Sequence, residues 1–130
     1  MKRSEAIELA VRQAYNALGV RPSDSRQKLH IQIRAAIGVA LSSYCNTYEI
    51  GAALNRDRSS VSHYTTKHVQ NLKYWEGYRD IYEIVSTEIE HNLQDHLLQL
   101  KIDTLNTRID KLLAAREELI NRLNAEHETT

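Results

Sequence analysis

The stretch EIGAALNRDRSSVSHYTTKHVQNL, residues 49–72, indicates the fold of the first half of the chain. Apolar side chains recur at helical spacing toward its two ends, predicting helices at residues 48–54 and 58–72. The polar residues 55–57 separate them, and Asp57 is a typical cap for the second helix. No part of the stretch alternates apolar and polar residues as a strand would. We therefore expect a short helix, a tight turn and a longer helix.

Helical patterns continue on both sides of this stretch. Upstream, apolar residues at helical spacing predict helices at residues 4–18 and 26–44, joined by a loop around Pro22. Downstream, the segment KYWEGY at residues 73–78 contains a glycine. The preceding helix either ends there or continues through the glycine at a cost of about 1 kcal/mol. No Pro or Gly follows, so one long helix is expected over residues 79–127, and the predicted fold class is all-α.

The size and composition of the chain fit a small intracellular protein. Its 130 residues and 15.0 kDa suit one small domain with an appendage, expected at residues 1–76 and 77–130. The single cysteine, Cys45, cannot form an internal disulfide, which fits the cytoplasm. No window approaches the roughly 18 apolar residues of a membrane span, so no membrane is expected as a partner.

The formal net charge of zero conceals two halves of opposite charge. Residues 1–79 contain twelve Lys or Arg and six Asp or Glu, which gives +6. Residues 80–130 contain five Lys or Arg and eleven Asp or Glu, which gives −6. The first half is therefore basic enough to bind a polyanion, and the acidic second half has another task.

The second half carries a heptad repeat. Leucines recur every seven residues at the d positions, and isoleucine, leucine or arginine occupies the a positions between them. The stripe consists of Leu98, Ile102, Leu105, Ile109, Leu112, Arg116, Leu119 and Leu123. Leu at d with Ile at a favours a parallel two-stranded coiled coil, in which Arg116 would cost stability and fix the register.

Two features leave other arrangements of this helix open. Leu113 and Ile120 make e positions apolar, which permits more than two strands. Upstream, apolar residues step by four from Ile81 to Leu97, so the seam shifts there. The alternative to self-association is one amphipathic helix that folds back on the basic half. Self-association is favoured, with a homodimer as the first expectation.

The order of helix, tight turn and helix is that of a helix-turn-helix unit, whose second helix enters the DNA major groove. The start of the second helix has side chains suited to that task. Ser59, Ser60 and Ser62 are small and, with the free N–H groups of the first turn, can hold phosphate oxygens. Arg58 can contact guanine edges or a phosphate. Asp57 can cap the helix or accept from a cytosine amino group.

The same residues resemble a known family. The pattern EIG-x-x-L-x-x-RD-x-[ST]-[ST]-V-x-H, followed by a lysine, resembles the signature of the DNA-binding C-terminal domain of the bacterial replication initiator DnaA. The matching residues are Glu49, Ile50, Gly51, Arg56, Asp57, Ser59, Ser60, Val61, His63 and Lys67. The resemblance covers about residues 3–74, more than half of the chain.

This resemblance implies an all-helical, Trp-repressor-like domain that binds a short duplex site. The base-contacting roles that it implies fall on Asp57, Ser59, Ser60 and His63, and the phosphate or positioning roles on Arg56 and Lys67. It also implies that an arginine from the basic loop enters the minor groove. Asp24 stands near the expected position, so the remaining candidates in the loop are Arg26, Lys28 and His30.

The chain also departs from the family pattern. Arg58 replaces the base-contacting histidine, and Ser59 and Ser60 replace threonines whose methyl groups could touch thymine. A changed recognition sequence is therefore expected. The ATPase module of the initiator is absent, because the chain contains no G-x-x-x-x-G-K-[ST] motif.

Other chemistries have weaker support. His63 and His68 are five residues apart with no third ligand nearby, so no metal site is expected. Cys45 is expected to be a buried structural thiol. Aromatic packing at the junction of the two halves, rather than base stacking, is expected of Tyr74, Trp75, Tyr78 and Tyr82. No carboxylate pair or nucleophile–base set stands out, so no catalytic residue, cofactor or small-molecule substrate is expected.

These patterns favour a sequence-specific double-stranded DNA-binding protein, homodimeric through its coiled coil, that regulates transcription or replication in a bacterium or phage. It is expected in the cytoplasm of the bacterial or phage-infected cell, associated with the nucleoid, with a replication or transcription protein as a candidate further partner. Two alternatives stay open. One is the DNA-recognising small subunit of a phage packaging machine, and the other is an adaptor that binds a protein partner through its coiled coil.

Overall fold

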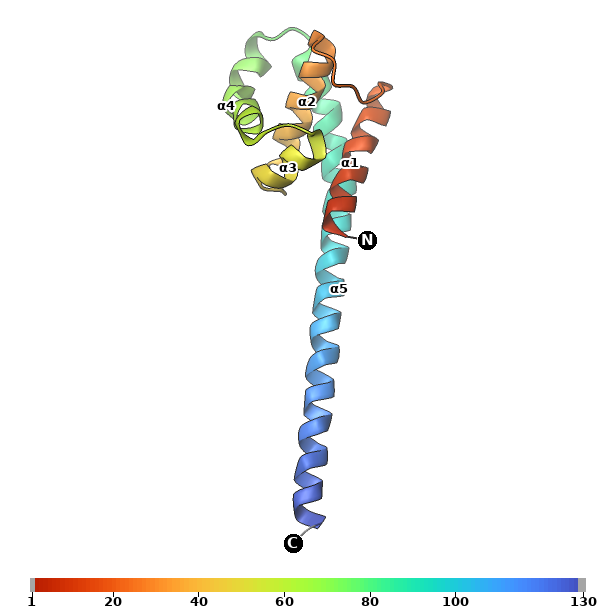
Figure 1. Ribbon diagram of the computed structural model, residues 1–130. Coiled ribbons are helices and arrows are strands. Elements are labelled where there is room, and N and C mark those ends of the chain that lie inside the picture. Colours follow the sequence, from red (N-terminus) through yellow and green to blue (C-terminus); the bar gives the residue numbers. More distant parts are fainter. Residues whose placement is uncertain (1, 129–130) are drawn as a thin grey trace. The chain divides into compact units, whose positions relative to one another are not determined.

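The computed structural model describes residues 2–128, and within them the regular secondary structure is all helix, as predicted, with no strand. The helices are α1 (Arg3–Leu18), α2 (Lys28–Leu41), α3 (Thr47–Leu54), α4 (Arg58–Tyr74) and α5 (Tyr78–Glu128), shown in Figure 1. The chain divides into two compact units, one up to Leu97 and one from Leu98 onward. Among the described residues, no helix has both the length and the apolar character needed to cross a membrane.

Local sequence signals set the ends of the helices. Gly19, at φ +69°, ends α1 in the left-handed conformation that glycine adopts without strain. Asn46 caps α3, since its side chain accepts a hydrogen bond from the backbone N–H of Glu49 at 2.9 Å. The KYWEGY segment breaks the helix rather than continuing it, because α4 ends at Tyr74 and Gly77 has φ +86°.

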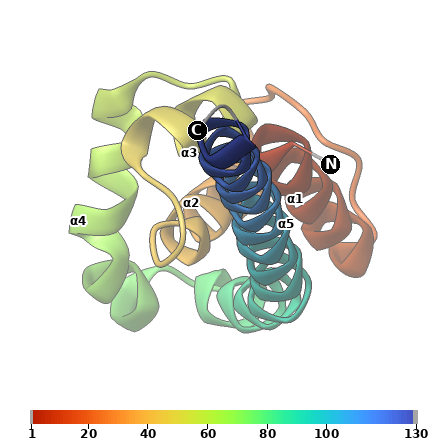
Figure 2. The same cartoon turned by 90° about the horizontal axis from the view of Figure 1, so that it is seen from below.

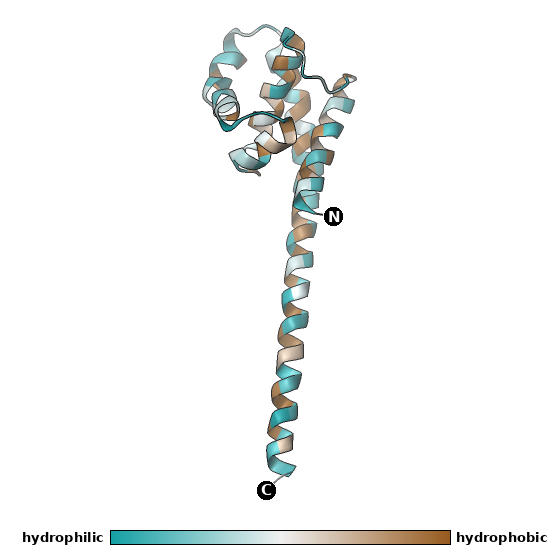
Figure 3. Cartoon of the chain, viewed as in Figure 1, coloured by the Kyte–Doolittle hydropathy of each residue, from teal (hydrophilic) through white to brown (hydrophobic). Residues whose placement is uncertain are grey.

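Helix α2 is the centre of the first unit and contacts α1, α3 and α4. Every residue from Gln32 to Leu41 is buried, and Figure 3 shows the apolar segments of this helix in brown. Helix α4 approaches it closely at Gly38, where an added Cβ would lie 2.8 Å from the Tyr64 ring. The helix is shorter than the predicted 26–44, and it ends in a turn in which the backbone N–H of Tyr44 donates to the carbonyl of Leu41, three residues back.

The first unit also includes the beginning of α5. Tyr78, Val85, Ile89, Leu93 and Leu97 are buried, and their side chains follow one face of the helix at one step of seven and then steps of four. Figures 1 and 2 show this part of α5 beside α1 and α2. The domain boundary expected between residues 76 and 77 therefore differs from the one observed, which follows Leu97. The sequence pattern indicated that the apolar stripe from residue 81 to 97 is a shifted part of the coiled-coil seam. In the structure this stripe packs within the first unit.

The second unit is the remainder of α5, in which all described residues from 98 to 128 are exposed except the half-buried Leu100. The predicted heptad stripe remains uncovered in the single chain. Its seven apolar members (Leu98, Ile102, Leu105, Ile109, Leu112, Leu119 and Leu123) are 49–64% exposed. Figure 3 shows brown apolar bands alternating with teal along this part of the helix. An isolated helix cannot bury such a stripe by itself, so it stays exposed in the single chain.

Candidate nucleic-acid interface

A tight turn connects α3 to α4. The backbone N–H of Arg56 donates a hydrogen bond to the carbonyl of Gly51 at 2.9 Å, and Asn55 adopts a left-handed conformation with φ +54°. A Cβ on Gly51 would lie 2.6 Å from the carbonyl oxygen of Arg56, so only glycine fits without displacing the backbone. Val61 is fully buried and packs beneath this turn. The α3–α4 angle therefore depends on residues 51 to 61.

Asp57 caps α4 as predicted. Its carboxylate accepts a hydrogen bond from the backbone N–H of Ser60 at 2.8 Å. This bond, together with one from the Ser60 hydroxyl, lowers the pKa of Asp57. Asp57, Arg58 and Ser59 are exposed, so the first turn of the helix and its unpaired N–H groups face solvent.

The exposed face of α4 gathers most of the residues predicted to contact DNA. Successive residues on a helix are separated by about 100°, so Ser59 and His63 point away from the buried Val61 and Ser62 lies beside them. The exposed predicted residues on α4 are Arg58, Ser59, Ser62, His63 and Lys67, while Ser60 is half-buried. Thr66 and Gln70 continue the same face but were not predicted. Thr66 lies three residues after His63 and seven after Ser59, and Gln70 lies seven after His63, and this helical spacing is the signal that would have identified them.

The loop before α2 is anchored by a buried arginine. Arg34 is only 5% exposed, and its guanidinium donates hydrogen bonds to the carbonyls of Ser23 at 2.7 Å and Ser25 at 2.8 Å. Arg26 and Lys28 are exposed beside this anchored segment, while His30 is half-buried. Arg34 gave no sequence signal, because a single cation in an apolar helix usually faces solvent.

An ion pair connects the same loop to the α3–α4 turn. The Arg56 guanidinium lies 3.4 Å from the carboxylate of Asp24, and it also donates to the Asn55 carbonyl at 2.8 Å. Asp24 stands where the resemblance placed a minor-groove arginine, and in the structure it contacts Arg56. Ion pairs this exposed contribute at most about 1 kcal/mol, so the contact orients the two segments more than it stabilises them.

Arg58 is held by a residue that the sequence did not single out. Tyr48 lies on the first turn of α3 and is 65% exposed. The Arg58 guanidinium donates a hydrogen bond to the Tyr48 hydroxyl at 2.8 Å, and its central carbon lies 4.2 Å from the centre of the Tyr48 ring. The pair joins the starts of α3 and α4 on the solvent side.

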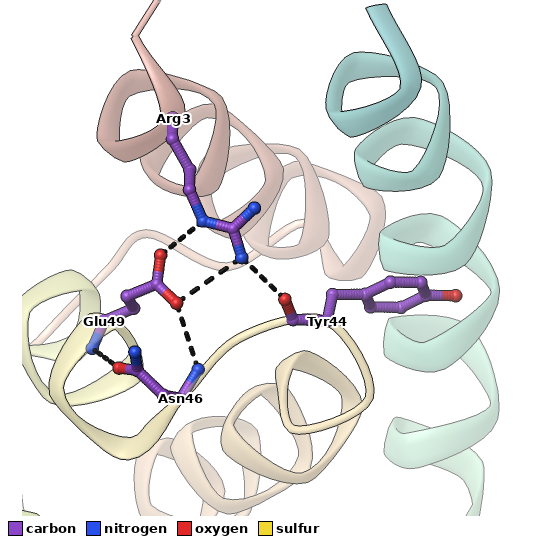
Figure 4. Close-up of polar contacts among 4 residues, drawn as sticks. All are labelled: Arg3, Tyr44, Asn46 and Glu49. Atoms are coloured by element: carbon purple, nitrogen blue, oxygen red, sulfur yellow. Dashed lines mark hydrogen bonds and ion pairs between the residues drawn. The ribbon is translucent and has the colours of Figure 1, made fainter. Parts of the chain in front are cut away.

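Glu49, a residue of the DnaA-like pattern, has a structural role. Figure 4 shows its carboxylate between the Arg3 guanidinium and the backbone N–H of Asn46. Arg3 also donates to the carbonyl of Tyr44 at 2.7 Å, so this network joins α1 to the start of α3. The hydrogen bond from Arg3 lowers the pKa of Glu49, and the same bond raises the pKa of Arg3.

We expect Glu49→Gln to lower the free energy of unfolding by about 1 kcal/mol at pH 7, the upper range for exposed ion pairs. Glutamine preserves the capping hydrogen bond to Asn46, so the loss reports the Arg3 contact. A lowered folded-state pKa means that this stability is present above the unfolded pKa of about 4.3 and is lost as the pH falls through the folded value. Melting temperatures measured from pH 3 to 7 should therefore converge at the acidic end.

Glu8→Gln is the matched control for this experiment, because it removes the same charge from an exposed position on α1. Equal losses for Glu8→Gln and Glu49→Gln, or a loss that does not shrink in acid, would contradict the role assigned to the ion pair.

Aromatic residues join α4 to α5. His68 Nδ1 lies 2.8 Å from the Tyr78 hydroxyl, its ring packs 4.3 Å from that of Tyr82, and Trp75 stacks on Tyr78. Burial lowers the pKa of His68 and raises that of Tyr78. These contacts agree with the expected packing at the junction, but Tyr74 does not take part and is 80% exposed.

Two other kinds of site were considered from the sequence, a reactive cysteine and a metal site. Cys45 is half-buried, and burial raises the pKa of its thiol to about 11, which opposes formation of the reactive thiolate. Within residues 2–128, no three His, Cys, Asp or Glu side chains gather as metal ligands would.

Comparisons with protein-family models, curated proteins and solved structures found no match to this chain. The resemblance to the DnaA domain therefore stays a prediction that rests on the residues of the pattern itself.

Proposed function

We propose that the chain is a sequence-specific double-stranded DNA-binding protein that uses α3, the turn and α4 as a helix-turn-helix. The observation that carries this proposal is the exposed face of α4. Hydroxyl, imidazole and cationic side chains follow one another along it from the capped N-terminus, including Ser59, Ser62, His63 and Lys67. A helix with this face, with a free first turn, can enter the major groove and meet both phosphates and base edges.

Charge supports the same proposal. The formal charge of residues 1–79 is +6, and each phosphate neutralised by a lysine or arginine releases a counterion. Arg26 and Lys28 are exposed on the segment that the Asp24–Arg56 pair connects to the α3–α4 turn. That segment is a candidate for a second contact with the backbone or minor groove of the same duplex.

Self-association through the second unit is the other part of the proposal. The uncovered Leu and Ile stripe from residue 98 to 123 fits a parallel coiled coil, and a dimer would bring two DNA-binding units to two half-sites. The role that follows is regulation of transcription or replication, in which paired half-sites raise the apparent affinity.

A second candidate is the DNA-recognising subunit of a larger ring, such as a phage packaging machine. It is supported by Leu113 and Ile120, which are exposed apolar residues at e positions and widen the stripe. A mass measured by light scattering separates the candidates, since two to four chains oppose a ring. An adaptor without DNA binding would show neither sequence selection nor salt-dependent binding to a duplex.

The deciding experiment selects bound sequences from random duplex DNA with the full chain. We expect an enriched sequence, with inverted repeats if the dimer is two-fold symmetric and direct repeats otherwise. Affinity should fall steeply as salt is raised, because counterions are released on binding. A failure to enrich any sequence, together with a flat salt dependence, would refute the proposal and favour the adaptor.

Arg58→Ala is expected to weaken binding to the selected site by about 10- to 100-fold, the range for one bidentate base contact. Binding to unrelated duplex DNA should change much less. Arg12→Ala removes the same charge from an exposed position on α1 and serves as the control in the same fluorescence anisotropy titrations. Equal effects of the two substitutions would mean that Arg58 acts only through its charge.

A further inference from the structure

Tyr48 is an aromatic residue outside the buried core. Its side chain is 65% exposed, yet it makes two contacts with Arg58, the first residue of α4. One is the hydrogen bond from Nη1 to the phenol oxygen at 2.8 Å, and the other is the stack of the guanidinium over the ring at 4.2 Å. The two residues come from different helices, so their pairing depends on the α3–α4 turn.

These two contacts restrict the guanidinium differently. The ring contact holds the central carbon of the guanidinium near the Tyr48 ring, and the hydrogen bond holds Nη1 at the phenol oxygen, so the group is fixed at two points. Nη1 is the nitrogen engaged by the tyrosine, so the edge formed by Nε and Nη2 retains two N–H groups that point the same way. Two parallel N–H donors are the requirement for bidentate contact with O6 and N7 of guanine.

We propose that Tyr48 is a specificity-determining residue that positions the Arg58 guanidinium for guanine. This inference rests on the proposed DNA-binding function and adds a residue from α3 to it. An arginine without this support has several rotatable bonds and reaches neighbouring phosphates as readily as a base edge. Removing Tyr48 therefore converts a base contact into a phosphate contact, and specificity is lost while the electrostatic contribution remains.

The test uses the full chain and the duplex obtained by selection from random DNA. Arg58→Ala first identifies the base position that depends on Arg58, and that position is then changed to each of the other bases. Wild-type protein should prefer guanine there by about tenfold or more. Tyr48→Ala should reduce this preference to about threefold or less, with the other base preferences unchanged and the salt dependence at least as steep, because Arg58 then contacts a phosphate.

Tyr48→Phe retains the stack without the hydrogen bond and should give an intermediate preference. Tyr74→Ala removes an exposed aromatic from the other end of α4 and should leave every base preference intact. Thermal unfolding of each variant checks that the exposed substitutions leave the fold in place.

Each outcome has a distinct meaning. An unchanged guanine preference in Tyr48→Ala, a loss spread evenly over all positions, or an Arg58-dependent position that is not guanine would overturn the inference while leaving DNA binding intact. Wild-type protein that selects no sequence would instead overturn the proposed function, and the inference with it.

Discussion

Replacing Gly51 by alanine is expected to lower the free energy of unfolding of the first unit by about 3 kcal/mol, the upper range for overpacking. The added Cβ would lie 2.6 Å from the carbonyl oxygen of Arg56, a backbone atom that cannot rotate away. This steric clash can be relieved only if the α3–α4 turn opens. Opening the turn would also weaken the hydrogen bond from Arg56 to Gly51 and the packing of Val61. The single tryptophan, Trp75, lies in this unit and reports its unfolding in urea by fluorescence.

Two other glycines provide graded controls. Gly19→Ala meets no atom within 4 Å and should cost only about 1 kcal/mol for its left-handed φ of +69°. Gly38→Ala would approach the Tyr64 ring at 2.8 Å, and because a half-buried side chain can shift, the loss should be intermediate. If Gly51→Ala lowers the free energy of unfolding no more than Gly19→Ala does, the tight turn does not require a residue without a side chain at position 51.

Replacing Leu112 by lysine is expected to weaken self-association by about a thousandfold or more. In the proposed coiled coil, Leu112 lies at the centre of the stripe and faces its counterpart in the second chain. Losing a buried leucine costs about 2 kcal/mol or more in each chain, so two copies lose at least about 4 kcal/mol. Sedimentation equilibrium should show wild-type protein at about twice the chain mass of 15.0 kDa and the variant at the mass of one chain.

The same helix supplies matched controls for this prediction. Ala114→Lys adds the same charge two residues away, at an f position outside the proposed seam, and should leave the mass unchanged. Arg116→Ile replaces the one charged a residue and should strengthen association. A wild-type protein that sediments as a single chain would refute self-association. A Leu112→Lys variant that associates as well as Ala114→Lys would place the seam elsewhere.

Much of the fold was predictable because its signals are local. Asp57 was predicted to cap α4, and Asn46 before α3 and Gly19 after α1 act in the same way on backbone groups within a few residues. Val61 is buried while Ser59, Ser62 and His63 of the same helix are exposed, a division that follows from their spacing along α4. The heptad spacing after Leu98 likewise predicts an exposed stripe in an isolated chain.

The partners of individual side chains required the tertiary structure. Tyr48 and Arg58 are ten residues apart, and Asp24 and Arg56 are thirty-two apart, so neither pair lies within reach of a helical repeat. Arg34 can be buried only because the carbonyls of Ser23 and Ser25, in the loop before α2, accept hydrogen bonds from its guanidinium.

The stripe at the start of α5 shows the same division between sequence and structure. Periodicity determined that an apolar face exists from residue 81 to 97 and again after Leu98, since spacing along a helix fixes which side chains share a side. Periodicity carries no information about what covers a face. Only the tertiary structure decided that Val85, Ile89 and Leu93 are buried within their own unit, whereas the face beyond Leu98 remains open to a partner.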